Sequence, residues 1–137
     1  MPESRLIRIR GFHCDAYGHV NNARYLELLE EARWEALVKN DVLKHFEALG
    51  LQFFIVNVNI SFKKPVVPND LADVQTSVKE FGRMSITFLQ EIYVDNALTT
   101  QADVTFVLFD TKASKPTSLT PEIRDIFNSF ENGQNKD

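Results

Sequence analysis

One long helical pattern among several strand patterns limits what this chain can fold into. Across residues 22–39 the apolar side chains recur at helical spacing, which predicts an amphipathic helix. From Leu51 onward the period changes to two, and four successive segments alternate apolar and polar residues. Their apolar faces need a cover, and the helix over 22–39 is the only long amphipathic element available. The sequence therefore predicts an α+β fold in which an antiparallel sheet wraps around one central helix.

The predicted sheet has five strands. A first strand precedes the helix and is expected over 5–12. The second begins at Leu51 and is ended by Pro65 and Pro68, and the others are expected over about 71–81, 83–94 and 98–110. Short connections between the later strands favour antiparallel pairing. Two shorter helices are expected, one over 42–49 with Gly50 as its stop, and one from the N-cap Thr120 to about Phe130.

The strand that begins at Leu51 is expected to be covered on one face only. Its predicted apolar face carries Phe54, Val56, Val58, Ile60 and Phe62. Its predicted polar face carries Asn57, Asn59 and Ser61. This alternation is typical of a half-buried strand.

Composition narrows the classes of protein that this chain can represent. With 137 residues, 44% of them hydrophobic, it is expected to form a single domain over 1–130, followed by a disordered tail over 131–137. The net charge of −4 disfavours a nucleic-acid surface, which needs clustered Lys and Arg. The longest apolar runs, such as 53–56, are far shorter than the roughly 18 residues of a membrane span. The N-terminus lacks the apolar core of a secretory signal, so a cytoplasmic location is expected.

The residues that could take part in a reaction lie between the first strand and the long helix, in the stretch from His13 to Tyr25. Asp15 falls in a loop just before the predicted helix start, and Asn22 falls at that start. Helix N-termini offer unpaired N–H groups and partial positive charge. An acid facing such a terminus suits acyl chemistry. A purely structural explanation is also open, because Asp15 and Gly18 fit the first and fourth positions of a type I turn and Asn22 fits an N-cap.

The motif Asp-x-x-Gly-His-Val-Asn-Asn-Ala-x-Tyr over 15–25 resembles that of hotdog-fold acyl-CoA thioesterases of the 4-hydroxybenzoyl-CoA thioesterase type. Residues 24–27, 30–34 and 56–60 resemble, within that family, the bacterial long-chain acyl-CoA thioesterase III group. The resemblance runs from about residue 5 to about 128. It implies the hotdog fold, and hydrolysis of a medium- to long-chain fatty acyl-CoA to free acid and CoA.

The resemblance also implies roles for individual residues. Asp15 matches the family's acidic residue, acting as base or nucleophile, and Asn22 matches the position whose backbone N–H polarises the thioester carbonyl. His19 is a further catalytic candidate. The candidates for substrate binding are Gly18, Tyr25, Lys63, Lys64, Arg83 and Ser85, with the basic residues expected near the CoA phosphates. No metal or redox cofactor is implied, and a homodimer or a homotetramer (a dimer of dimers) is expected.

Other interpretations of the same residues are weaker. His13, His19 and Asp15 could be read as metal ligands, but no further Cys or carboxylate completes a set. Cys14 could be read as a nucleophile, but nothing places a base beside its sulfur. Two functional alternatives stay open: a hydratase or dehydratase of the same fold, and a non-catalytic acyl-CoA-binding module.

Overall fold

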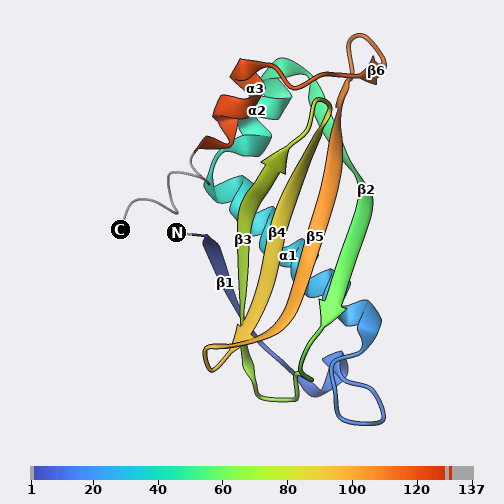
Figure 1. The fold of residues 1–137 in the computed structure, drawn as a ribbon, viewed down its shortest axis with the longest axis vertical. Coiled ribbons are helices and arrows are strands. Elements are labelled where there is room, and N and C mark those ends of the chain that lie inside the picture. The colour runs from blue at the N-terminus through green and yellow to red at the C-terminus, as the bar shows by residue number, and fades with distance from the viewer. Residues whose placement is uncertain (1, 129, 131–137) are drawn as a thin grey trace.

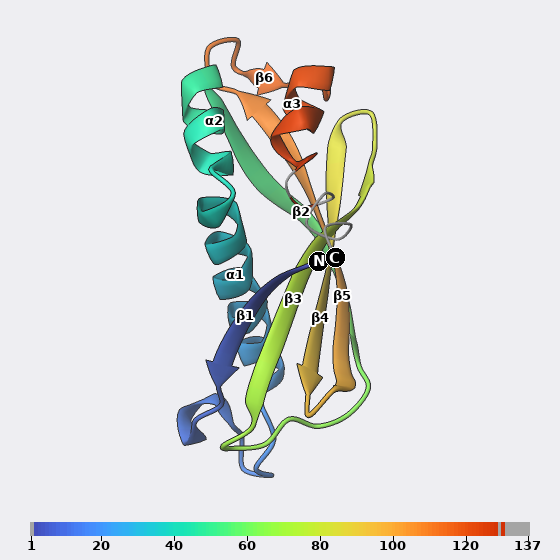
Figure 2. The ribbon, with the colours of Figure 1, turned by 90° about the vertical axis from the view of Figure 1, so that its left-hand side faces the viewer.

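Helix α1 (Asn22–Lys39) is the central element, and the sheet lies along its buried side (Figures 1 and 2). The computed structural model describes residues 2–128 and 130, so the predicted tail lies outside the described residues. The predicted bounds of α1 are confirmed. Its buried stripe consists of Tyr25, Leu28, Leu29, Ala32, Ala36 and Leu37. The two alanines let the helix approach the sheet closely.

Five long strands form one antiparallel sheet in the order β1-β3-β4-β5-β2. The strands are β1 (Glu3–Arg8), β2 (Leu51–Phe62), β3 (Leu71–Phe81), β4 (Ser85–Val94) and β5 (Ala97–Asp110). The expected α+β hotdog arrangement is therefore confirmed. A two-residue strand that the sequence did not predict, β6 (Lys115–Pro116), pairs with the end of β5.

Two short helices cover the end of the sheet that lies away from the start of α1 (Figure 1). Helix α2 (Val42–Leu49) has its predicted bounds, and Gly50 ends it in the left-handed conformation with φ 70°. Helix α3 (Pro121–Ile126) begins after the predicted cap, because the Thr120 hydroxyl accepts a hydrogen bond from the Ile123 N–H. The buried rings of Phe46, Phe88, Phe106 and Phe127 pack together beneath both helices.

Several element ends differ from the prediction, and strand β1 already begins at Glu3 instead of residue 5. Strand β1 stops at Arg8 instead of Phe12, because residues Gly11–His13 form a 3₁₀ turn in which the His13 Nδ1 accepts from the Arg10 N–H at 2.8 Å. Strand β4 starts at Ser85 instead of residue 83, after a tight turn closed by the Gly82 N–H and the Ser85 carbonyl. Helix α3 stops at Ile126 instead of near residue 130.

The predicted faces of β2 are wrong in its first half. The pairing with β5 shifts between Ile55 and Asn57, so Val56 is an extra residue in a β-bulge. Before the bulge, Phe53 packs on the core, whereas Phe54 points to the opposite face of the sheet and contacts Phe109 at a ring-centroid distance of 5.9 Å. Only the residues after the bulge follow the predicted alternation.

Strand β2 also lies at an edge of the sheet, so one row of its backbone groups has no partner strand within the chain. Its exposed apolar side chains are Phe54, Ile55, Val56, Val58 and Phe62, each at least 36% exposed. Long, apolar edge strands are normally covered in native proteins. Among the described residues, no helix is long and apolar enough to cross a bilayer.

Candidate active site

The loop before α1 holds Asp15 at the start of a tight turn. The Gly18 N–H donates to the Asp15 carbonyl at 3.0 Å, and Gly18 has φ 77°, a left-handed conformation that favours glycine. One carboxylate oxygen of Asp15, Oδ1, accepts from the N–H groups of Tyr17 at 2.9 Å and His19 at 3.4 Å. No partner from residues 2–128 and 130 engages the other oxygen, Oδ2. The turn interpretation is thus confirmed, and it leaves one exposed carboxylate oxygen available for chemistry.

The N-cap of α1 is Asn21, one residue earlier than the cap that the sequence offered. The Asn21 Oδ1 accepts from the Ala23 N–H at 2.9 Å, while the Asn21 backbone has the extended dihedrals φ −65° and ψ 142°. Asn22 is therefore the first helical residue. Its own N–H meets no acceptor within the described part of the chain, and it carries the partial positive charge of a helix start.

Most of the predicted site residues line one cavity of about 260 Å³. The lining residues are Asp15, His19, Val20, Asn22, Tyr25, Phe62, Lys63, Lys64 and Pro65. The N–H groups of Lys63 and Lys64 both donate to the Thr99 carbonyl, which fixes the segment after β2 beside the loop. The cavity thus combines a carboxylate, a free helix-start amide and two cations.

Tyr25 forms a wall of this cavity. The side chain is buried, and its ring packs on Phe62 with centroids 4.9 Å apart. Burial raises the pKa of the Tyr25 phenol, although hydrogen bonds with the Val66 backbone and the Thr100 side chain oppose this. The phenol is therefore protonated at neutral pH, and Tyr25 supplies shape instead of a base.

The remaining candidates lie outside the cavity. Ser85 pairs with Val107, which pairs with Phe54 of β2, whereas Phe62 at the cavity lies eight residues further along β2. That separation is about 26 Å at the usual rise of a strand. The structure therefore does not bring Arg83 and Ser85 to Asp15 within one chain. Gly18 does not line the cavity either and shapes the turn.

The weaker interpretations find little support. The His13 ring is bound to the Arg10 N–H and does not line the cavity. Burial, followed by the charge of Asp15, raises the pKa of the Cys14 thiol, which disfavours the reactive thiolate. Within residues 2–128 and 130, no three His, Cys, Asp or Glu side chains gather as a metal site would require.

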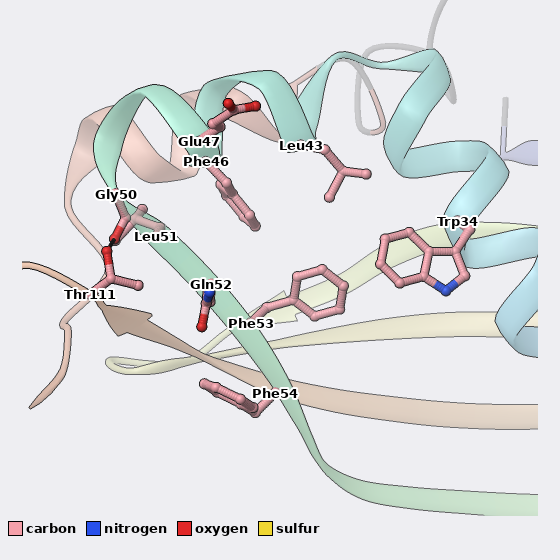
Figure 3. A pocket seen from close by; sticks show the side chains of 10 residues that line it. All are labelled: Trp34, Leu43, Phe46, Glu47, Gly50, Leu51, Gln52, Phe53, Phe54 and Thr111. Atoms are coloured by element: carbon pink, nitrogen blue, oxygen red, sulfur yellow. Dashed lines mark hydrogen bonds between the residues drawn. The ribbon is translucent and has the colours of Figure 1, made fainter. Parts of the chain in front are cut away.

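A second, larger cavity of about 540 Å³ was not predicted. It lies between α1, α2 and the start of β2, and its walls include Trp34, Leu43, Phe46 and Phe53 (Figure 3). These residues come from three different elements, and the bulge at Val56 is what places Phe53 on this side, opposite to the predicted phase. No signal in the sequence marks such a cavity.

Comparisons with known proteins agree with this architecture. A family model described as the thioesterase-like superfamily matches residues 11–127. The long-chain acyl-CoA thioesterase FadM of Escherichia coli is 39% identical over 121 residues, covering 87% of this chain and 92% of FadM. The acyl-CoA thioester hydrolase YbgC of E. coli is 28% identical over 123 residues, covering 85% of this chain and 89% of YbgC.

A solved structure gives the same result. The crystal structure of YbaW, a probable thioesterase from E. coli, superposes with a TM-score of 0.88 at 35% identity. The match covers 93% of this chain and 98% of YbaW. The chain belongs to the thioesterase-like superfamily.

Proposed function

We propose that this protein is an acyl-CoA thioesterase that hydrolyses fatty acyl-CoA to a free acid and CoA in the cytoplasm. The observation that carries the proposal is that Asp15 and Asn22, the first residue of α1, line the same cavity. The names of the relatives FadM and YbgC support the same activity, and FadM supports a long acyl chain.

The cavity supplies what thioester hydrolysis needs. Asp15 either removes a proton from water as it attacks the thioester carbonyl, or attacks that carbonyl itself to form an anhydride that water then opens. In both routes negative charge develops on the carbonyl oxygen, where the Asn22 N–H can donate a hydrogen bond. When the carbonyl re-forms, the C–S bond breaks, which in the second route happens before water opens the anhydride. The CoA thiolate takes up a proton, from protonated Asp15 in the first route and from solvent in the second, and leaves as a thiol. His19, exposed beside Asp15, is in position to contact the thioester.

Coenzyme A is an anion, and this chain has a net charge of −4, so binding needs local cations. We assign this role to Lys63 and Lys64, which line the cavity and are exposed. Their charges would hold the phosphates while the thioester reaches Asp15.

A second copy of the chain would complete the site. We propose that two copies pair antiparallel along β2, which would cover its unpaired edge and its exposed apolar residues. A two-fold axis between the two β2 strands, level with the middle of each, swaps the ends of the sheet. It would bring Arg83 and Ser85 of one copy to the same end as the Asp15 cavity of the other, about three strand spacings or 14 Å away. Two such dimers could then form a tetramer.

Replacing Val58 by Lys should separate the two copies. Val58 lies on β2 and is 36% exposed, so a charge there would be buried without a partner on association. We expect sedimentation velocity to show a shift to monomer. Val38→Lys adds the same charge on the exposed side of α1, where Val38 is 61% exposed, and should leave the assembly unchanged. A Val58→Lys protein that associates like the wild type would contradict pairing along β2.

Release of free thiol from fatty acyl-CoA tests the proposed function directly. Hydrolysis liberates the CoA thiol, and a chromogenic thiol reagent should report it for every acyl chain that the enzyme accepts. A hydratase or dehydratase would change the acyl group without releasing thiol. A binding module would saturate without turnover. Absence of thiol release across short, medium and long acyl chains would overturn the proposal.

A further inference from the structure

The hairpin between β3 and β4 carries Arg83 and Ser85 at its tip. The tip is closed by a hydrogen bond from the Gly82 N–H to the Ser85 carbonyl at 2.7 Å. The pairing of the two strands shifts between Val78 and Glu80, so an extra residue forms a β-bulge just before the tip. A bulge bends its strand and interrupts the ladder of hydrogen bonds. The direction of the tip therefore depends on contacts from outside the hairpin.

The C-terminal segment supplies such contacts. Helix α3 lies at the end of the sheet where β3 turns into β4 (Figures 1 and 2). The Arg124 Nη2 donates to the Gly82 carbonyl at 3.4 Å, and the Arg124 guanidinium lies over the Phe81 ring, 5.3 Å from its centroid. The Leu119 N–H donates to the Arg83 carbonyl at 2.9 Å. One short segment thus holds two consecutive carbonyls of the tip.

The Arg124 guanidinium faces an aromatic ring and a neutral carbonyl instead of an acid. In the part of the chain that the structure describes, no carboxylate oxygen lies within 4.0 Å of it. A planar guanidinium can stack on a ring while its edge donates hydrogen bonds, so the two contacts fix its geometry together. Both contacts of this side chain go to the end of the hairpin.

Helix α3 does not depend on Arg124 for its own position. Ile123 and Phe127, on the buried side of this segment, are 5% and 0% exposed. The Phe127 ring packs on the rings of Phe46 and Phe88, with centroids 5.8 Å and 6.2 Å away. The helix is therefore a fixed base from which Arg124 reaches the hairpin, and removal of the guanidinium should leave the fold in place.

The position of the tip matters for the proposed reaction. Arg83 is exposed, and pairing of two copies along β2 would bring the tip of one copy toward the Asp15 cavity of the other. A CoA thioester whose carbonyl lies at Asp15 keeps its phosphates outside the cavity, and a guanidinium matches a phosphate in shape and charge. A tip that turned away would take Arg83 from the phosphates without disturbing Asp15 or Asn22.

We infer that Arg124 is a positioning residue for the binding of CoA: it holds the tip of the β3–β4 hairpin where Arg83 contacts a phosphate of the thioester bound by the other copy. The inference rests on the proposed function and on pairing along β2. Arg124 itself touches no substrate and takes no part in the chemical step. Its effect should therefore appear in the affinity for CoA and not in the rate at which a bound thioester is hydrolysed.

Two thioesters separate positioning from general damage to the enzyme. Decanoyl-CoA carries phosphates, whereas decanoyl-N-acetylcysteamine has the same acyl group and thioester without them. Arg124→Met should raise KM for decanoyl-CoA by about three- to tenfold at unchanged kcat, because one charge-assisted contact is weakened. KM for decanoyl-N-acetylcysteamine should stay the same. A merely structural role would affect both thioesters alike.

A double substitution tests whether Arg124 acts through Arg83. Arg83→Met should raise KM for decanoyl-CoA at least as much as Arg124→Met does, and should spare the thioester without phosphates. In the double variant, Arg124→Met should add little, because the guanidinium that the tip carries is already gone. Effects on KM that multiply in full would overturn the inference.

Three further variants separate geometry from charge and from misfolding. Phe81→Leu removes the ring beneath Arg124 at unchanged net charge, and should also raise KM for decanoyl-CoA alone. Arg124→Lys keeps the charge without the planar fork and should give an intermediate KM. Arg5→Met removes an arginine that binds Glu31 and Glu35 on α1, and should change neither KM.

The outcomes distinguish this inference from the proposed function. A wild type that hydrolyses both thioesters, with KM in Arg124→Met unchanged or raised equally for both, would overturn the inference alone. A wild type that releases thiol from neither would overturn the function. Calorimetry with free CoA then decides the inference without turnover: Arg124→Met should bind CoA about three- to tenfold more weakly, and equal affinity would contradict the role of Arg124.

Discussion

Asp15→Asn should lower the kcat for acyl-CoA hydrolysis by about 10²-fold or more, the usual loss when a positioned acid–base group is removed. The substitution is well matched to the loop. The asparagine Oδ1 can accept from the Tyr17 and His19 N–H groups just as the Asp15 Oδ1 does, so the turn should persist. What disappears is the negative charge and the basic oxygen. KM should change little, because Asp15 is not expected to hold the CoA.

A matched control exists in the same chain. The Asp70 Oδ2 accepts from the Val67 N–H at 3.0 Å, which is a similar side-chain-to-backbone bond, and Asp70 does not line the Asp15 cavity. Asp70→Asn should therefore keep its activity. If Asp15→Asn and Asp70→Asn hydrolyse acyl-CoA equally fast, Asp15 is neither the catalytic base nor the nucleophile. If Asp15 is required, single-turnover hydrolysis in heavy-oxygen water separates its two possible roles. Label that enters the Asp15 carboxylate indicates an anhydride intermediate.

The parts of the fold that the sequence predicted well are those fixed by local chemistry. The bounds of α1 and α2 follow from apolar spacing and from a cap or stop beside each helix, such as Gly50. The faces of β2 were mispredicted because a single extra residue, Val56, reverses the phase of a strand. No residue type marks such a bulge, since it arises from the pairing with β5.

The same distinction, between features fixed by local sequence and features that arise from strand pairing, applies to the candidate site. The shared cavity of Asp15 and Asn22 was predictable because both belong to one continuous loop and helix start, only seven residues apart. The position of Arg83 relative to Asp15 was not predictable, because it depends on which end of the sheet each strand begins from. The cavity of about 540 Å³ escaped prediction for a related reason. Trp34, Phe46 and Phe53 come from three elements that meet only after folding.

Asn22→Pro should lower kcat by about 10²- to 10³-fold, the typical loss when one oxyanion donor is removed, while the protein stays folded. Proline lacks the backbone N–H, so this substitution deletes the proposed donor itself. The position tolerates it unusually well: Asn22 is the first helical residue, where proline is favoured, and its N–H has no acceptor in the described part of the chain. The preceding residue, Asn21, already has the extended dihedrals that proline demands.

Asn22→Ala separates the backbone from the side chain. Alanine removes the same side-chain amide as proline but retains the N–H, so its activity should stay close to that of the wild type. Thermal unfolding of both variants checks that the helix start is intact, because loss of the Asn21 cap would lower the stability of each protein. Equal activity of Asn22→Pro and Asn22→Ala would show that this N–H does not stabilise the oxyanion. A large loss in Asn22→Pro alone, at unchanged stability, would locate the charge that develops in the transition state at the N-terminus of α1.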